Sequence, residues 1–203
     1  PSTEGLLALY EFEGDALDAS GNGLDGTVTD GEFVDSGMPD MGMALQLNGA
    51  GNVDLGNPAL LDFATEDWTV SAWFNTGMTG TGDANKGAIV AKGGDNSGGH
   101  RYALIMSEST EGVVSLICDD NASKIQTHST SVTNDNEWHH VVGQRKNPSI
   151  NIYIDGVLEA TSDVTAEYDL SGTVQHNAYI GAVTNNGDGS LYKVYYGLVD
   201  DVR

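Results

Sequence analysis

Oxygen-bearing side chains gather near the start of the chain in the nine residues DASGNGLDG, numbered 18–26. Asp18, Ser20 and Asn22 alternate with small residues and precede a glycine, as in the first half of an EF-hand loop, where such oxygens surround Ca²⁺. The second half of that motif is missing, because its twelfth position is Thr29 instead of a bidentate Glu. The alternative is a plain turn, since Asn-Gly adopts positive φ readily and Asp18 and Ser20 can bond to their own backbone.

Basic and polar side chains also gather among glycines in the segment KGGDNSGGHRY, residues 92–102. Lys92 and Arg101 in this segment, with nearby Lys86, are three of only eight basic residues in the chain. A basic spot on an acidic surface can recognise a carboxylate or sulfate of an acidic polysaccharide. The alternative is a solvated hairpin whose charges offset neighbouring aspartates.

The segment NNGDGSLYKVYYG, residues 185–197, carries three tyrosines. Alternation along a strand turns Tyr192 and Tyr196 toward one face and Tyr195 toward the other, so at least one of them belongs to the core. An exposed tyrosine offers a platform for the C–H face of a sugar. The candidate ligand-binding residues of both segments are Lys92, Asn96, His100, Arg101, Tyr102 and Tyr192.

The composition excludes several classes of partner. Eight Lys and Arg stand against thirty Asp and Glu, a formal net charge of −22, and no basic residue precedes Lys86. Phosphate binding needs a basic face, so nucleic acid and anionic membrane surfaces are not expected partners. No segment is apolar enough to insert into a membrane. Such a charge is tolerated where salt or divalent cations screen it, which favours an extracellular setting, although an acidic surface also serves solubility alone.

Short apolar runs rich in Val, Ile, Tyr and Trp recur along the chain between clusters of Gly, Asn and Asp, and this pattern predicts strands and turns. In NIYIDGVLEA, Asp155-Gly156 predicts a type I′ hairpin turn. Roughly a dozen short antiparallel strands without a helix imply an all-β fold, a two-sheet antiparallel β-sandwich of jelly-roll type. Trp73 is expected to pack, although alternation places it on the face opposite Phe74. Cys118 is the only cysteine, and we expect a buried, unreactive thiol.

Read in order, the motifs WTVSAWF, WHHVVGQRKNPSINIYIDGV, AYIGAV and GLVDDVR resemble the LamG-like, concanavalin A-like jelly-roll domains of secreted bacterial polysaccharide-degrading enzymes and surface proteins. The opening ALYEFEGDALDASGNGLDGTV and the following GMALQLNGAGNVDLG also resemble that family, so the similarity extends from about residue 6 to the end. The chain begins without Met. We therefore expect residues 1–203 to be one such domain, covalently linked to others in a larger protein.

The resemblance implies a structural Ca²⁺ between the N-terminal loop DASGNG and the closing strand LVDDVR. The implied side-chain ligands are Asp18, Asn22 and Asp200 or Asp201, and backbone carbonyls would complete the six to eight oxygens that Ca²⁺ takes. Adjacent residues of a strand point to opposite faces, so only one of Asp200 and Asp201 donates unless the strand ends there. A plain turn at Asp18 remains the alternative.

The sequence does not present a set of catalytic residues. Retaining glycosidases on related jelly rolls use E-x-D-x-x-E to hold two carboxylates about 5 Å apart. In EFEGD, Glu11, Glu13 and Asp15 are instead expected to alternate along a first strand with a solvated face. His139 and His140 are neighbours on a strand and diverge, so they cannot readily share a metal ion.

These observations together favour a non-catalytic carbohydrate-binding module of a secreted or cell-surface protein, with a polysaccharide or oligosaccharide, neutral or acidic, as partner. A second hypothesis is an adhesion or protein-interaction domain of a large surface protein. A third, a lyase, needs Tyr, His and Arg on one face, whereas His100, Arg101 and Tyr102 are consecutive and cannot all point one way.

Overall fold

The computed structural model describes residues 4–80, 86–95, 99–164 and 168–203. Within these ranges the chain forms fourteen strands and two short 3₁₀ helices, and no α-helix. The strands are β1 (Thr27–Asp35), β2 (Met43–Asp54), β3 (Trp68–Asn75), β4 (Gly87–Asp95), β5 (His100–Met106), β6 (Val114–Asp120), β7 (Lys124–His128), β8 (Trp138–Lys146), β9 (Ser149–Ile154), β10 (Val157–Asp163), β11 (Ala178–Ile180), β12 (Val183–Asn185), β13 (Leu191–Tyr192) and β14 (Tyr196–Asp200). The 3₁₀ helices are η1 (Ala59–Leu61) and η3 (Ser171–Gln175).

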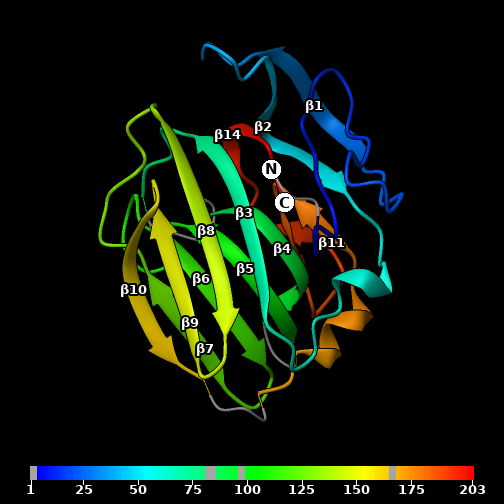
Figure 1. Cartoon of the computed structure of the whole chain (residues 1–203), viewed down its shortest axis with the longest axis vertical. Helices are drawn as coiled ribbons and strands as arrows, with labels where there is room; N and C mark the ends of the chain where they lie inside the picture. The colour runs from blue at the N-terminus through cyan, green and yellow to red at the C-terminus, as the bar shows by residue number, and fades with distance from the viewer. Residues whose placement is uncertain (1–3, 81–85, 96–98, 165–167) are drawn as a thin grey trace.

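The strands follow one hydrogen-bonded path in the order β10-β9-β8-β3-β14-β2-β11-β4-β5-β6-β7, with β1 on β2, β12 on β4 and β13 on β12. Figure 1 shows β3, β8, β9 and β10 in one layer and β4 to β7 in the layer behind. The two ends of the path meet, because Ser162 Oγ of β10 donates to the Gln126 carbonyl of β7 at 3.2 Å. The predicted antiparallel sandwich is therefore confirmed, in a nearly closed form.

Alternation along the strands builds the core between the layers. In β3, Val70, Ala72 and Phe74 are buried, and the residues between them face the other side of the sheet. On β8, a Cβ at Gly143 would lie 2.9 Å from side-chain atoms of both Leu104 and Leu116, so glycine is what allows the layers to approach there. The core is thus continuous across the two layers.

The hairpin between β9 and β10 has the predicted turn. Asp155 has φ 50° and Gly156 has φ 79°, which are the two positive values that a type I′ turn requires. This turn fixes the register in which Tyr153 of β9 lies opposite Leu158 of β10.

The expectation of a first strand through Glu11, Glu13 and Asp15 is wrong. Pairing there is limited to an isolated bridge between Tyr10 and Val202, and Phe12 has φ 48° with its ring buried in the core. The backbone turns to bury this ring, while the three carboxylates remain exposed as expected. The bridge sets the N-terminal segment beside the end of β14.

None of the helices in the described part of the chain is long and apolar enough to cross a membrane.

Candidate functional site

The segment 92–102, expected to be an exposed basic loop, begins and ends in buried strands. Lys92 lies in β4 and is fully buried. Its Nζ donates to Asn57 Oδ1 and to the His176 carbonyl at 3.2 Å, and it lies 3.1 Å from Asp62 Oδ1. Burial lowers the pKa of Lys92, and the ion pair with Asp62 opposes that shift. Lys92 is therefore a paired cation of the interior.

The neighbouring candidates on β5 are also inaccessible. Arg101 is fully buried, forms an ion pair with Asp95, and lies opposite Asp119 of β6. Tyr102 is buried and donates its hydroxyl to the Leu61 carbonyl at 3.0 Å.

His100 is partly buried against η3, where its ring occupies the space that a Cβ at Gly172 would need. Asn96 lies outside the described residues. The expectation of an exposed basic spot at Lys92 and Arg101 is wrong, because both charges are matched inside the fold.

The tyrosine segment covers the outer side of β4 and β5. Tyr195 is fully buried and Tyr196 is 56% exposed, which confirms that at least one of these tyrosines belongs to the core. Tyr192 packs on a second apolar cluster, which lies on the side of β4 to β6 that faces away from the core. Lys193 Nζ pairs with Asp95 and, at 3.0 Å, with Glu108. This layer is therefore closed on its outer side by β12, β13 and buried ion pairs.

The other layer has an accessible side, which we call the outer face. In cross-strand register, Thr69 aligns with Gln144, Ser71 with Val142 and Trp73 with His140 on β3 and β8. β8 continues the rows onto β9 and β10. All these side chains are partly or fully exposed. The outer face consists of Thr69, Ser71, Trp73, His140, Val142, Gln144, Asn151, Tyr153, Leu158 and Thr161.

Aromatic rings and hydrogen-bonding groups alternate across the outer face. The rings of Trp73 and His140 lie 5.1 Å apart. Thr161 Oγ1 donates to Asn151 Oδ1 at 2.8 Å, and Asn151 Nδ2 donates to Gln144 Oε1 at 3.5 Å. Partly exposed rings beside amides and hydroxyls can stack on the apolar face of a sugar and bond its hydroxyls.

The two adjacent histidines diverge as expected. His139 Nδ1 lies 2.8 Å from Asp155 Oδ2 and its Nε2 lies 3.2 Å from Asp135 Oδ1. Burial alone would lower the pKa of His139, but these two carboxylates raise it above its ordinary value. His140 instead contacts Trp73 on the outer face. The two rings thus have separate partners.

A cavity of about 250 Å³ lies at the Trp73 end of the outer face, and we call it the acidic pocket. Its lining residues are Glu11, Glu13, Asp40, Met41, Trp73, Asp200, Asp201 and Arg203. β14 ends at Asp200, and Asp201 follows with φ 47°, so both adjacent carboxylates reach the same pocket. The strand ends here, which is the condition under which both Asp200 and Asp201 were expected to face one site.

Asp200 is the most buried carboxyl group of the acidic pocket. It is 3% exposed, and its Oδ1 accepts the Asp201 N–H at 2.7 Å. Burial, with the nearby charges of Asp201, Glu13 and Glu11, raises the pKa of Asp200 to about 7. A buried carboxylate among other carboxylates is a place where a cation lowers the free energy of the folded state. The residues of the pocket therefore fit a hard cation such as Ca²⁺.

The predicted ligands Asp18 and Asn22 do not line this pocket. Asp18 accepts hydrogen bonds from the Leu9, Ser20 and Leu24 N–H groups and from Ser20 Oγ, at 2.9 to 3.0 Å. Asn22 Nδ2 donates to the Leu6 and Leu7 carbonyls. Burial would raise the pKa of Asp18, but these donors lower it. Asp18 and Asn22 thus organise the turn, and the four predicted ligands do not form one set.

Within the described ranges, no three His, Cys, Asp or Glu side chains are already arranged to hold a metal ion. Glu13 is engaged by the Met43 N–H at 3.2 Å, and Asp201 by the Arg203 guanidinium at 2.8 Å. A cation in the acidic pocket would therefore draw these carboxylates from their present partners.

Sequence reasoning missed several residues of both sites. Alternation in INIYI, with Ile150, Ile152 and Ile154 inward, would have placed Asn151 and Tyr153 outward. Asp40 comes from the β1–β2 connection, and local pattern does not reveal that it reaches the end of β14.

Comparison with known proteins gives a family and a fold. The family described as the concanavalin A-like lectin/glucanases superfamily matches residues 47–203. Domain 4 of AbnA, a GH43 extracellular arabinanase from Geobacillus stearothermophilus solved with arabinotriose, has a TM-score of 0.72 at 21% identity, covering 97% of this chain and 89% of that chain. No curated protein matches the sequence.

Two further solved structures have the same fold. The CBM40 domain of the Ruminococcus gnavus IT-sialidase, bound to α2,3-sialyllactose, has a TM-score of 0.56 at 14% identity, covering 87% of this chain and 90% of that chain. The binding domain of Paraclostridial Mosquitocidal Protein 1 has a TM-score of 0.65 at 16% identity and covers 91% of this chain. This chain spans 44% of that toxin domain.

Proposed function

Since the chain belongs to the concanavalin A-like lectin/glucanases superfamily, we propose that it is a non-catalytic carbohydrate-binding module of an extracellular, polysaccharide-acting protein with further domains. The observation that carries the proposal is the outer face, where Trp73 and Tyr153 lie among amide and hydroxyl groups on one accessible layer. The similar arabinanase and sialidase domains, solved with arabinotriose and sialyllactose, support a sugar as the ligand.

We infer that the preferred glycan is neutral. Lys92 and Arg101, which would have attracted an acidic polysaccharide, are buried in ion pairs. The acidic pocket borders Trp73, and the chain carries a formal net charge of −22. Both features repel carboxylates and sulfates, so they oppose an acidic ligand on the outer face.

The module binds without turnover in this proposal. Hydrolysis with retention needs two carboxyl groups about 5–5.5 Å apart on either side of the glycosidic bond. The ten residues of the outer face include no carboxylate. A binding module tethered to a catalytic domain raises the local concentration of substrate and needs no chemistry of its own.

A structural Ca²⁺ is the second part of the proposal, and the acidic pocket is its place. Asp200, Asp201, Glu11, Glu13 and Asp40 would supply carboxylate oxygens, and the ion would neutralise their repulsion. These residues come from the N-terminal segment, the β1–β2 connection and the end of β14. The ion would therefore join three separate parts of the chain beside the outer face.

The test is a glycan array probed with the domain in Ca²⁺ and in EDTA, with release of reducing sugar measured in the same wells. We expect a neutral oligosaccharide to bind without turnover. Trp73→Ala and Tyr153→Ala should each weaken binding about tenfold, since a stacked ring contributes on the order of 1.4 kcal/mol. Tyr179→Ala, on β11 away from the outer face, is the matched control.

Three results would change the proposal. Reducing sugar released from a bound glycan would make the protein an enzyme. Equal affinity of Trp73→Ala and Tyr179→Ala would remove the site from the outer face. Binding to no glycan, with stabilisation by Ca²⁺ intact, would favour an adhesion or protein-interaction domain.

A further inference from the structure

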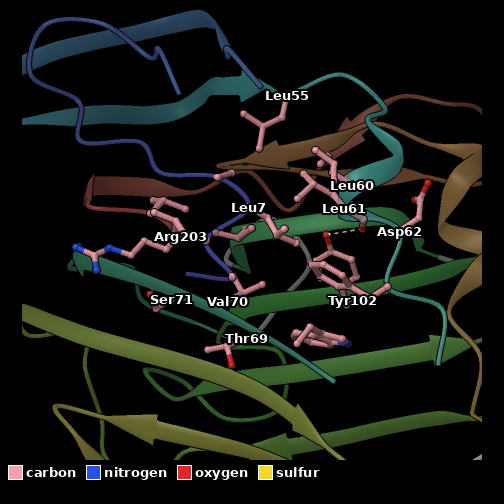
Figure 2. A pocket seen from close by; sticks show the side chains of 18 of the residues that line it. Leu7, Leu55, Leu60, Leu61, Asp62, Thr69, Val70, Ser71, Tyr102 and Arg203 are labelled. Atoms are coloured by element: carbon pink, nitrogen blue, oxygen red, sulfur yellow. Dashed lines mark hydrogen bonds between the residues drawn. The ribbon is translucent and has the colours of Figure 1, made fainter. Parts of the chain in front are cut away.

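A second cavity, of about 540 Å³ and mostly apolar, also lies against the N-terminal segment, and we call it the apolar cavity. It is bounded by residues 4–8 and Tyr10, by the chain from η1 to the first half of β3, and by single residues of β4 and β5. Figure 2 shows Leu7, Leu61, Val70 and Tyr102 around its interior, with Arg203 and Asp62 at opposite ends. Its volume falls in the range of small-molecule pockets. Arg203 borders both this apolar cavity and the acidic pocket.

We propose that the apolar cavity binds a small, uncharged, flat aromatic molecule that carries a hydrogen-bond acceptor. The cavity shares Thr69 and Ser71 with the border of the outer face, but its aromatic wall lies on other residues, and the proposal does not depend on sugar binding. Three features of the lining carry the argument: a cluster of rings, an indole N–H without an acceptor, and the distribution of charge.

Three aromatic rings meet in the wall of the apolar cavity. The ring centres of Phe63 and Trp68 lie 5.4 Å apart, those of Phe63 and Tyr102 4.9 Å, and those of Trp68 and Tyr102 5.0 Å. Tyr102 is held in place by its hydrogen bond to the Leu61 carbonyl, drawn in Figure 2. A preformed aromatic wall favours a flat ligand, because the ring faces stack without reordering the protein.

Trp68 lines the cavity with an unused donor. Its side chain is 6% exposed, and its Nε1 is buried without a hydrogen-bond partner among the described residues. A buried N–H that lacks an acceptor is unfavourable, and buried indoles usually find one. The hydroxyl of Tyr102 is already engaged, so within the aromatic wall the Trp68 N–H is the side-chain donor that remains for a carbonyl or ether oxygen of a ligand.

The charges around the cavity favour an uncharged ligand. Glu4, Asp62, Glu66 and Asp67 line it, and Arg203 is the one cation in the lining. These carboxylates repel an anion, and Asp62 is already paired with Lys92. A cation would leave water for a mostly apolar wall, where Asp62 is paired with Lys92 and Asp67 accepts the Asn147 N–H at 2.9 Å, so its burial is unfavourable. A neutral molecule avoids both difficulties.

The test uses prodan, an uncharged naphthalene with one ketone oxygen, whose emission shifts to the blue in apolar surroundings. We expect saturable binding with a blue shift. Trp68→Phe keeps a ring and removes the N–H, and it should weaken binding about tenfold. Leu60→Glu places a charge at the mouth of the cavity, where Leu60 is 48% exposed, and it should weaken binding without affecting the fold. Val157→Glu, on the β9–β10 hairpin where Val157 is 62% exposed, is the control and should bind as the unaltered chain does.

The proposal is wrong if prodan shows no saturable shift with the folded chain, or if Leu60→Glu and Val157→Glu bind it equally. It is also wrong if Trp73→Ala, on the outer face, abolishes the shift while Leu60→Glu preserves it. Light scattering on the same samples adds one more refuting result, namely a dimer of this chain that excludes prodan. Because Leu60 is exposed, Leu60→Glu is expected to fold normally, so the test remains decisive even if Trp68→Phe disturbs folding.

Discussion

Replacing Asp200 by Asn removes the charge of this side chain and leaves its shape and surroundings unchanged. Asn matches the shape of the protonated carboxyl group and keeps an oxygen that accepts the Asp201 N–H. The pKa of Asp200 is about 7 in the folded chain, against an ordinary value of 3.8. A raised pKa of an acid means that the folded state binds the proton more tightly than the unfolded state does. Folding stability is therefore greatest below the ordinary pKa and falls as the pH rises toward 7.

The difference of about three pH units corresponds to about 4 kcal/mol at neutral pH without a cation. In EDTA at pH 7, Asp200→Asn should therefore be more stable than the unaltered chain, with a melting temperature roughly 10 °C higher for a domain of this size. At pH 4 the two proteins should melt within a few degrees of each other. In Ca²⁺ the difference in melting temperature should become smaller or change sign, because only the unaltered chain offers the Asp200 carboxylate to the ion.

Calorimetry at several pH values, in EDTA and in Ca²⁺, measures both effects. Asp163→Asn removes a carboxylate from an exposed position at the end of β10 and is the control for net charge. If Asp200→Asn fails to stabilise the chain in EDTA at pH 7, or stabilises it no more than Asp163→Asn does, then the ionised carboxylate of Asp200 does not destabilise the folded chain. If Ca²⁺ stabilises both proteins equally, the ion does not bind at Asp200.

Three further predictions concern single side chains. Lys92→Ala should lower the free energy of unfolding, measured in urea, by about 3–5 kcal/mol, because it leaves the carboxylate of Asp62 without its cation. The double variant Lys92→Ala/Asp62→Ala should lose much less stability than the sum of the losses in the two single variants. The stability that His139 gains from Asp155 should be complete below about pH 6.5 and lost as the pH rises through its raised pKa, so the difference in melting temperature between the unaltered chain and His139→Gln should shrink by pH 8.5; a difference independent of pH would contradict the pairing. Cys118 is buried and its pKa is raised to about 12 by burial, so a thiol reagent should label it only after unfolding, and rapid labelling of the native chain would be the contrary result.

The sequence predicted correctly those parts of the fold that depend on neighbouring residues. Alternation and the Asp155-Gly156 pair gave the hairpin, because a type I′ turn needs two positive φ values in adjacent residues. The resemblance to LamG-like, concanavalin A-like domains is also confirmed. The hairpin depends on residues close together in the chain, and the resemblance depends on the order and spacing of several short motifs along it.

The misplaced residues are those whose partners lie far away in sequence. Glycines around Lys92 and Arg101 suggested an exposed loop, but Lys92 finds Asp62 and the His176 carbonyl, both distant along the chain. Glu13 reaches Asp200 because the Tyr10–Val202 bridge sets the N-terminal segment beside the end of β14, and Asp40 reaches it because β2 pairs with β14. No window of sequence contains such a set, so the position of the acidic pocket could not be predicted from alternation or spacing.

The bridge between Tyr10 and Val202 also determines how the domain responds to a mechanical load. It consists of two backbone hydrogen bonds, from the Tyr10 N–H to the Val202 carbonyl at 2.9 Å and from the Val202 N–H to the Tyr10 carbonyl at 3.0 Å. A pull on the two chain ends would act on this bridge, and on the two backbone hydrogen bonds between Arg203 and Ser71, before it reaches the long ladders of the two layers. The N-terminal segment would peel away first and take Glu11 and Glu13 out of the acidic pocket. Under tension a cation bound in the acidic pocket would therefore be released while the outer face on β3, β8, β9 and β10 stays folded.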